Sequence, residues 1–350
     1  MIGCAIAREL SMRGARCTVV DPRPVAGGAT QASAGMLAPY VEAHGGGPML
    51  DLCVRSLDVY DAWIAGLRAE GADVEYRRIG TLEIALSPDG AAALRRGHGE
   101  WLDPAAVAGL VPQLGPTAGA LRDARHGYVD ARQLANALAQ SAMRHGATFV
   151  TARVERIDRQ GTARLVDVGP DNDALRADAV VLAAGAWTNR IHGVRTPPMR
   201  PVRGQLLVDW EGLGGIRTIL WGPDCYIVPK AQPPYLMIGA TVEDAGFDER
   251  PTKEGADRLF EAAHRLLPAL QRDAIVEVRV GLRPATPDDL PVLGDDPDEP
   301  GVFHASGHYR NGVLLAPITA KLMADLVIAD RRDGCLQHFR MDRFESLPSI

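Results

Sequence analysis

Arg283 is the first side chain of the sequence whose surroundings suggest chemistry. It lies in GLRPATPDDLPVLG, residues 281–294, between a glycine and a proline at the expected end of a strand. A guanidinium in such a place can form a bidentate pair with a carboxylate ligand. The alternative is a structural salt bridge with Asp288 or Asp289.

A second segment that could bind an anion is HASGHYRNGVLLAP, residues 304–317. A glycine-containing turn brings His308, Tyr309, Arg310 and Asn311 to the start of a predicted helix. The N-terminus of a helix offers unpaired N–H groups and a positive dipole end, which suit a developing anion, and Arg310 could strengthen that effect. The alternative is an ordinary surface loop.

The start of the chain resembles half of a dinucleotide-binding unit. A helix is predicted over residues 2–13, ended by Gly14, and a short buried strand over 17–20 leads into Asp21. In such units the third glycine of GxGxxG lets the helix pack on the sheet, and an acidic residue about 20 positions later binds the ribose. Gly3 and Asp21 fit these roles, but the first strand and the first two glycines are missing, so an ordinary helix and strand is the alternative.

The segment AVVLAAGAW, residues 179–187, ends a predicted strand in small residues. Gly185 would allow a ligand to approach the backbone at the carboxyl edge of a sheet. A buried strand followed by a tight turn is the alternative.

Other catalytic patterns are not supported. His304 and His308 are four residues apart, but Ser306 and Gly307 between them favour a turn, and no acidic or cysteine partner completes a metal site. The sequence also contains no GxSxG elbow and no GxxxxGK[ST] loop, which weakens hydrolase and P-loop interpretations.

Composition narrows the class of protein. The 350 residues predict about two domains, and the formal charge of −6 argues against a nucleic-acid partner. No uninterrupted apolar run is long enough for a membrane helix, and Arg8 and Glu9 interrupt the apolar start, so no signal peptide is expected. The five scattered cysteines contain no CxxC, which favours a reducing cytoplasm without disulfides or zinc.

The order of elements predicts how these segments meet. βα units at both ends of the chain should form one parallel sheet, whereas the strand-rich middle should form a second layer or domain. The further helices are expected at residues 49–69, 132–145, 252–267 and 313–328.

Taken together, these segments resemble the D-amino-acid oxidase superfamily of FAD-dependent oxidoreductases, most closely its glycine oxidase branch of the thiamine pathway. The resemblance extends over nearly the whole chain, in MIGCAIAREL, GGATQASAGMLAP, CYIVP, MIGATVED, GLRPATPD, GHYRNGVLLAP and FRMDRFE (339–345). It implies an α/β fold whose second domain is α+β. The Rossmann-like FAD-binding domain would comprise residues 1–75, 130–200 and 281–350, and an antiparallel-sheet substrate domain residues 76–129 and 201–280.

The resemblance also assigns residues. Arg283 would bind the substrate carboxylate, Tyr226 would contact it through its hydroxyl, and Arg310 would be a second substrate-side residue; these three form the expected catalytic set. The positions expected to bind FAD are Ile2, Gly3, Asp21, Pro22, Ala29, Thr30, Ala34, Gly35, Met36, Val154, Ala184, Gly185, His308, Tyr309, Arg310, Asn311, Gly312, Val313 and Leu314.

The chain departs from the family pattern at several positions. A family histidine two places before the tyrosine is Asp224 here, and a methionine after GAT is Val242, so the entrance to the site and the preferred amine are expected to differ. No cysteine lies between Cys225 and Cys335, which predicts non-covalent FAD. The family also has a strand and GxGxx before the position of Gly3. The sequence is therefore expected to be about a dozen residues short and to bind FAD poorly.

The function implied by the resemblance is oxidation of glycine or a similar small amino acid to its imino acid. Glyoxylate or another 2-oxo acid, ammonia and hydrogen peroxide would follow, with oxygen as the expected acceptor, and the imine could serve thiamine thiazole synthesis. A D-amino-acid or sarcosine oxidase or dehydrogenase is the first alternative, and a non-catalytic remnant without FAD is the second. A nicotinamide dehydrogenase is more distant, and a homo-oligomer stays open.

Overall fold

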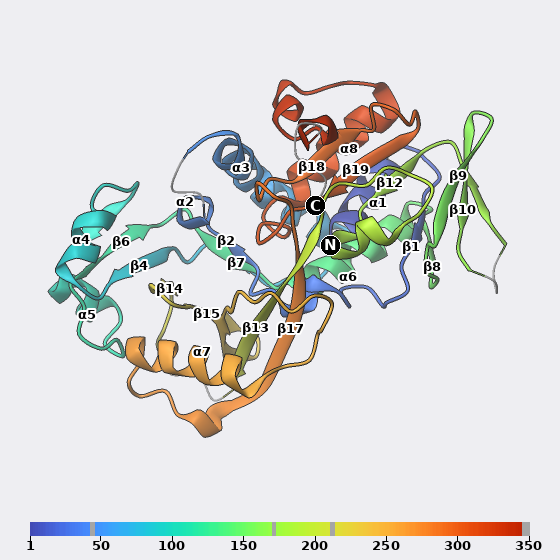
Figure 1. Cartoon of the computed structure of the whole chain (residues 1–350). Helices are drawn as coiled ribbons and strands as arrows, with labels where there is room; N and C mark the ends of the chain where they lie inside the picture. Colours follow the sequence, from blue (N-terminus) through green and yellow to red (C-terminus); the bar gives the residue numbers. More distant parts are fainter. Residues whose placement is uncertain (43–45, 170–172, 211–213, 345–350) are drawn as a thin grey trace.

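The computed structural model describes residues 1–42, 46–169, 173–210 and 214–344. Glu345, the last residue of the FRMDRFE segment, lies outside them. The chain forms an α/β region and a region built on a large sheet, which meet along the long strands β13 and β17 (Figure 1). The α-helices are α1 (Ile2–Met12), α2 (Pro39–Glu42), α3 (Pro48–Ala69), α4 (Pro88–Leu94), α5 (Pro104–Leu110), α6 (Ala131–Arg144), α7 (Lys253–Leu266) and α8 (Ala316–Ala329).

Short strands alternate with these helices. They are β1 (Thr18–Val20), β2 (Met36–Leu37), β3 (Tyr76–Arg77), β4 (Thr81–Ala85), β5 (Glu100–Leu102), β6 (Gly119–Asp123), β7 (Gly127–Val129), β8 (Thr148–Val150), β9 (Arg156–Gln160), β10 (Ala163–Asp167), β11 (Leu175–Ala177), β12 (Val180–Leu182), β13 (Arg200–Asp209), β14 (Ile219–Trp221), β15 (Tyr226–Ala231), β16 (Pro234–Gly239), β17 (Ile275–Ala285), β18 (Val292–Asp295) and β19 (Val302–Ser306). The 3-10 helices are η1 (Ala29–Ala32), η2 (Gly185–Arg190), η3 (Arg272–Ala274), η4 (Gly334–His338) and η5 (Met341–Phe344).

The two ends of the chain come together in the α/β region, as predicted, but the prediction of one parallel sheet is wrong: β1 (with β8) and β19 (with β12 and β18) lie in two separate small sheets, because no described strand joins them. β1 pairs with β8 in parallel, and β12 pairs with β19 in parallel, with β18 antiparallel on the far side of β19. One apolar core joins α1, α3, α6 and α8. Local signals set the ends of these helices: Gly14 follows α1 with a φ of +86°, and the Asp130 carboxylate caps α6 by accepting from Gln133 N at 2.8 Å.

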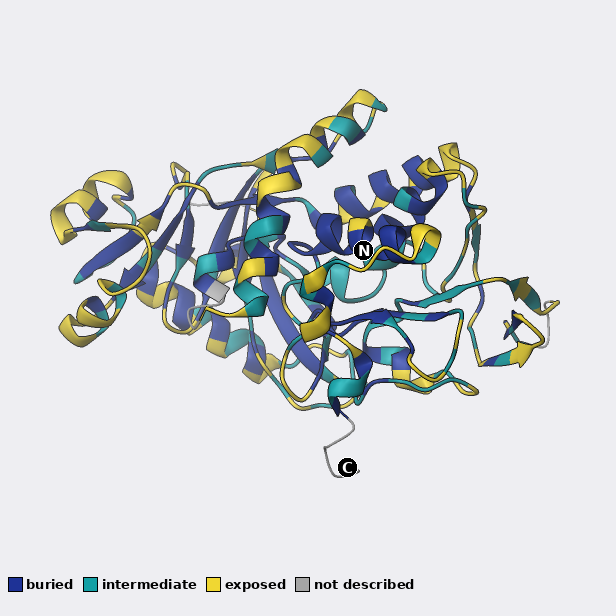
Figure 2. Cartoon of the chain, turned by 90° about the horizontal axis from the view of Figure 1, so that it is seen from above, coloured by how far each residue is buried: buried dark blue, intermediate teal, exposed yellow. Residues whose placement is uncertain are grey.

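The second region is an eight-stranded sheet in the order β17-β13-β16-β15-β14-β4-β6-β5. All its neighbouring strands are antiparallel except β14 and β4. Helix α7 covers one face through an apolar core, and the other face packs against residues that include Ala34 and Tyr128. Buried residues follow the strands of this sheet, whereas exposed residues lie on the outer helices (Figure 2). The predicted domain boundary after residue 280 falls inside β17.

Three local predictions differ from the structure. β1 was expected to be buried, but Thr18 is exposed and Val19 and Val20 are only partly buried. The last helix was expected from residue 313 and begins at Ala316, because residues 312–315 form turns and Pro317 occupies the first helical turn. The strand β18 was not predicted, because its four residues include Gly294 and Asp295 and give no alternating pattern.

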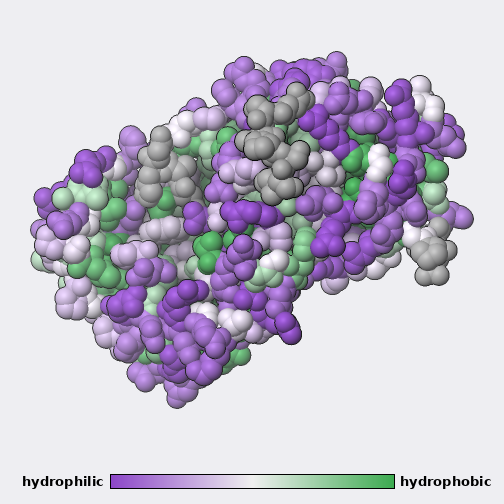
Figure 3. Space-filling model, in the orientation of Figure 1, coloured by the Kyte–Doolittle hydropathy of each residue, from purple (hydrophilic) through white to green (hydrophobic). Residues whose placement is uncertain are grey.

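The surface seen in Figure 3 is mainly hydrophilic, with small hydrophobic patches.

Candidate active site

Arg283 and Tyr226 share one face of the large sheet, although they lie on different strands. Gly281, two residues before Arg283, pairs with Gly204, and Leu206 pairs with Gly239, which in turn pairs with Tyr226. Partners across a ladder and alternate residues along a strand point to the same side. The sheet register therefore brings together two side chains that are far apart in the sequence.

Two glycines leave room for these side chains. A Cβ at Gly204 would lie 2.3 Å from Nη1 of Arg283, and a Cβ at Gly239 would lie 2.4 Å from the Tyr226 hydroxyl. The guanidinium and the phenol therefore lie flat over glycine backbone. The Tyr226 ring also stacks on Trp221, with centroids 5.6 Å apart, which fixes its orientation.

The partner of Arg283 is a backbone carbonyl, not a carboxylate. Its Nη1 donates to the Thr241 oxygen at 2.9 Å. Asp288, one of the two partners considered for a structural salt bridge, pairs instead with Arg343 at 2.8 Å. The geometry thus favours the ligand-binding interpretation of Arg283 over a salt bridge to Asp288.

The segment predicted to line the cofactor lies against the strand that carries Arg283. A Cβ at Gly281 would approach Ala32 Cβ to 3.0 Å and Ala29 Cα to 3.1 Å, so η1 packs directly on β17. Gly35 has a φ of +73°, and a side chain there would collide with the Val129 carbonyl, 1.8 Å from its Cβ. Only glycine fits this crossing.

The loop of residues 307–315 also contacts this strand. Tyr309, with a φ of +47°, donates its N–H to the carbonyl of Pro284 at 3.0 Å, next to Arg283. The Arg310 guanidinium lies over the Tyr309 ring, 5.4 Å from its centroid. The loop is therefore tied to the end of β17 where Arg283 lies.

His308 supports this loop from inside the protein. Its Nε2 lies 3.1 Å from the Thr319 hydroxyl. Burial lowers the pKa of His308 to about 3, with the Met1 ammonium as a smaller cause, so the ring is neutral at ordinary pH. His308 was predicted to contact the cofactor; its packing against Thr319 was not predicted.

Two side chains of α3 hold the loop as well, although they belong to no motif. Tyr60 donates its hydroxyl to the Val313 oxygen at 2.8 Å, and Ser56 donates to the Leu314 oxygen at 2.6 Å. Both side chains are fully buried. Both residues lie within a long amphipathic helix, and nothing in their spacing predicts these hydrogen bonds.

The AAGAW turn, residues 183–187, lies beside the start of α1. A Cβ at Gly3 would be in ordinary contact with Ala183 Cβ at 3.6 Å, so the helix start lies against the AAGAW turn. Gly185 has a φ of +56° and open space where a side chain would point. No side chain caps α1, and the first N–H groups of a helix have no partner within it.

Two hydroxyls outside the predicted site, those of Ser306 and Thr188, hold this turn in place. Ser306 donates to the Leu182 carbonyl at 2.8 Å and lies 2.9 Å from the Thr188 hydroxyl, which in turn donates to the Gly185 carbonyl at 2.8 Å. β19 thereby fixes the end of β12.

Asp21 and Val154 each lie near the carboxyl end of the β1–β8 pair. Asp21 donates its N–H to Val150, the last residue of β8, at 3.2 Å, and its carboxylate accepts from Arg23 N at 2.9 Å. Val154 packs in the same apolar cluster as Val20 and Val150. The structure therefore gathers an uncapped helix start, a glycine turn and an exposed carboxylate, a set that fits a dinucleotide such as FAD.

The two departures from the family pattern lie at the surface. Asp224 pairs with Arg265 at 2.6 Å, and Val242 is 58% exposed. Neither is brought against Arg283 by a described contact.

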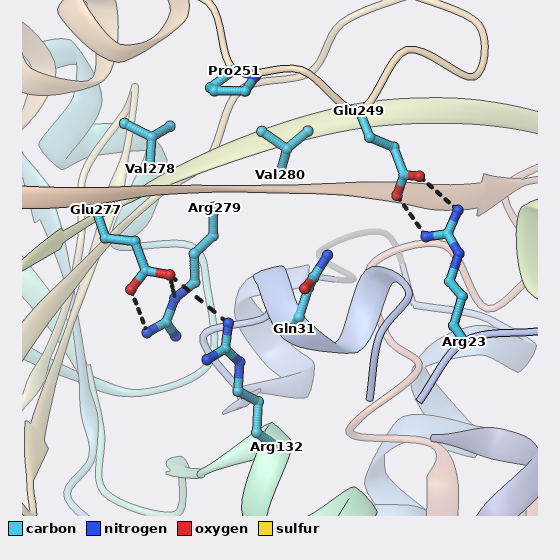
Figure 4. Close-up of a pocket in the computed structure, with 9 residues that line it drawn as sticks. All are labelled: Arg23, Gln31, Arg132, Glu249, Pro251, Glu277, Val278, Arg279 and Val280. Atoms are coloured by element: carbon cyan, nitrogen blue, oxygen red, sulfur yellow. Dashed lines mark hydrogen bonds and ion pairs between the residues drawn. The ribbon is translucent and has the colours of Figure 1, made fainter. Parts of the chain in front are cut away.

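A polar pocket of about 260 Å³ lies next to this site, along Val278 and Val280 of β17 (Figure 4). Its charged walls are paired with one another: Arg23 with Glu249 at 2.6 and 2.9 Å, and Arg279 with Glu277 at 2.8 and 2.9 Å.

Neither a group of metal-ligating side chains nor a membrane-spanning helix occurs in the part of the chain that the structure describes. Among the described residues, no three histidine, cysteine or acidic side chains are grouped so that they could hold a metal ion, and His304 pairs with Asp296 at 2.9 Å. Within the same residues, no helix is both long and apolar enough to cross a membrane.

Comparisons with known proteins show the family to which this chain belongs. The family described as FAD dependent oxidoreductase (DAO) matches residues 1–326. A bifunctional protein ThiO/ThiG of Nostoc sp. is 36% identical over all of this chain, which spans about half (54%) of that relative's length. A glycine oxidase of Geobacillus kaustophilus is 34% identical over 93% of this chain and 90% of its own length.

Solved structures show the same fold. The crystal structure of glycine oxidase from Geobacillus kaustophilus superposes with a TM-score of 0.90 at 33% identity, covering 98% of this chain and 96% of that one. An iminodiacetate oxidase from Chelativorans sp. BNC1 superposes with a TM-score of 0.87 at 25% identity, covering 97% and 96%. These matches confirm the predicted superfamily and fold class: the chain belongs to the DAO family of FAD-dependent oxidoreductases.

Proposed function

We propose that this protein oxidises glycine, or a similarly small amino acid, with non-covalently bound FAD. The observation that carries the proposal is that Arg283 and Tyr226 lie on the same face of the sheet, each over a glycine, and that the segment of residues 29–36 packs against this face. A guanidinium whose described partner is a neutral carbonyl can bind a carboxylate. The similarity to glycine oxidases of comparable length supports this substrate class.

The protein's own residues would bind and orient the substrate. Arg283 would bind the carboxylate and the Tyr226 hydroxyl would donate a hydrogen bond to it, so that the amino-acid Cα faces the segment of residues 29–36. Arg310 would act on the substrate side of the 307–315 loop. Holding a reactant in a productive orientation can lower a barrier by roughly 7–11 kcal/mol in favourable systems, so no separate acid–base pair is needed.

FAD, when bound, supplies the two-electron oxidation of the substrate C–N bond and passes the electrons to oxygen as hydrogen peroxide. The residues proposed to hold it are those around Gly3, Asp21, Gly185, Gly35 and the 308–314 loop. The released imine hydrolyses to glyoxylate and ammonia, or serves thiazole synthesis for thiamine. We further propose a cytoplasmic location, in keeping with five free cysteines.

The test is a peroxide assay of FAD-supplemented protein on glycine, sarcosine and D-amino acids. The glycine proposal predicts the highest kcat/KM on glycine. A preference for sarcosine or a D-amino acid would replace the substrate assignment. A folded, colourless protein that releases no FAD on acid treatment would rule out the whole proposal.

A further inference from the structure

The loop of residues 240–252 links β16 to α7 and contacts the Arg283 side chain. It follows β16 and ends at Thr252, the N-cap of α7. Thr241, near its start, supplies the carbonyl oxygen that accepts from Arg283 Nη1 at 2.9 Å. The position of this one oxygen therefore bears on the orientation of the guanidinium.

One buried residue, Gln205, holds both ends of this loop: its backbone holds the end at Thr241 and its side chain the end at Thr252. The Gln205 N–H donates to the Thr241 hydroxyl at 2.8 Å, and the Gln205 carbonyl accepts from Thr241 N at 3.2 Å. Its side-chain amide donates to the Thr252 hydroxyl at 2.7 Å and accepts from Thr252 N at 2.9 Å. Gln205 is fully buried, and a Cβ at Gly255 would lie 2.0 Å from its Nε2, so α7 begins with a glycine that makes room for it.

The same amide also binds the acidic side chain of the loop. Glu243 accepts from Gln205 at 2.8 Å and from Arg203 at 2.6 and 2.9 Å. Burial favours the neutral acid, but hydrogen bonds from Thr241, Gln205 and Arg203 outweigh it and keep the pKa of Glu243 below its ordinary value. The Glu243 charge is thus neutralised by Arg203, and its oxygens are committed away from Arg283.

The outer part of the loop is anchored separately, to the α/β region. Glu249 forms a bidentate pair with Arg23 (Figure 4), and the Phe247 ring lies 5.8 Å from that of Trp187. These contacts involve neither Thr241 nor Gln205. They offer a way to loosen the loop without touching its inner end.

We propose that Thr241 is a positioning residue for substrate-carboxylate binding: the backbone of Gln205 holds the Thr241 hydroxyl and N–H, and the Thr241 carbonyl orients Arg283 without neutralising its charge. The inference rests on the proposed role of Arg283. A neutral acceptor suits this purpose, because a carboxylate in the same place would compete with the substrate.

The experiment compares Thr241→Val with Thr241→Ser in FAD-saturated protein. Valine removes the hydroxyl that accepts from Gln205 N, whereas serine keeps it. The affinity for acetate, a carboxylate without an amine, is followed through the visible spectrum of the bound flavin, with methylamine as the matched ligand that has no carboxylate. We expect Thr241→Val to raise the Kd for acetate about fivefold to tenfold and Thr241→Ser to stay within about twofold. The Kd for methylamine and for FAD should not change.

A double-mutant cycle separates positioning from general stability. Thr241→Val should not add to the loss caused by Arg283→Met, because both changes act on the same contact. Glu249→Gln, on the same loop, should leave acetate affinity unchanged. Equal acetate affinity in Thr241→Val and Thr241→Ser, with a lower Tm alone, would overturn the positioning role. Acetate binding that does not depend on Arg283 would instead overturn the proposed function beneath it.

Discussion

Two arginines on the same face of β17, Arg279 and Arg283, have contrasting surroundings. Arg279 is held by both oxygens of Glu277 at 2.8 and 2.9 Å and lines the polar pocket, where Arg23 is paired with Glu249 in the same way. Arg283 lies over Gly204 and donates to a backbone carbonyl. The charge of Arg279 is balanced by a carboxylate, which suits a structural role. The charge of Arg283 faces only a neutral acceptor among its described partners, so it can bind a carboxylate ligand.

The largest expected effect is the loss of turnover on removing the Arg283 guanidinium, for which removal of the Arg279 guanidinium is the comparison. Arg283→Met should lower kcat/KM on glycine by about a hundredfold to a thousandfold, because charge-assisted hydrogen bonds to the carboxylate are lost. Arg279→Met should mainly lower stability, since it leaves Glu277 without its partner. Steady-state peroxide assays with matched thermal unfolding would check both. Similar losses of kcat/KM in the two variants would break the contrast.

Filling the glycine floor should have the next largest effect. Gly204→Ala places a Cβ 2.3 Å from the guanidinium, which must move away. Because a displacement of about 1 Å can cost on the order of a hundredfold in rate, we expect kcat/KM to fall at least tenfold. Gly109→Ala, in α5 with nothing within 4 Å, is the matched control and should leave turnover unchanged. Normal turnover by Gly204→Ala would show that Arg283 does not need this position.

The neutral His308 makes the loop near Arg283 sensitive to acid. Its folded pKa of about 3 lies below the unfolded value of about 6.5, so the unfolded chain binds the extra proton between these values. Stability should therefore fall as pH drops below 6.5, by up to about 1 kcal/mol per pH unit from this group. In His308→Gln the fall should be shallower, as measured by urea unfolding at pH 7 and pH 5. Parallel slopes for the two proteins would contradict this.

The smallest effect is expected in the paired pocket. Glu277 is more than a third exposed, so Glu277→Gln should change the free energy of unfolding by less than about 1 kcal/mol. Turnover should be unaffected. A clear loss of turnover with normal stability would place the pocket within the active site.

Local structure was largely predictable from the sequence. The helix ended by Gly14 and the helices predicted at residues 49–69, 132–145 and 252–267 follow from spacing and cap chemistry that act over a few residues. The short outer elements between 86 and 129 were less predictable, because a seven-residue helix or a three-residue strand carries too few apolar positions to show a period.

The candidate site was predictable as a set of residue types and motifs, but not as an arrangement. The sequence by itself determined the motifs around Arg283 and the 308–314 loop, because local backbone needs and residue chemistry are written in neighbouring positions. Only the tertiary structure decided that Tyr226 shares a face with Arg283, and that Gln205, Thr241, Ser56 and Tyr60 support the site. Those contacts join residues between 36 and 258 positions apart, and strand register and helix packing set them, not any local pattern.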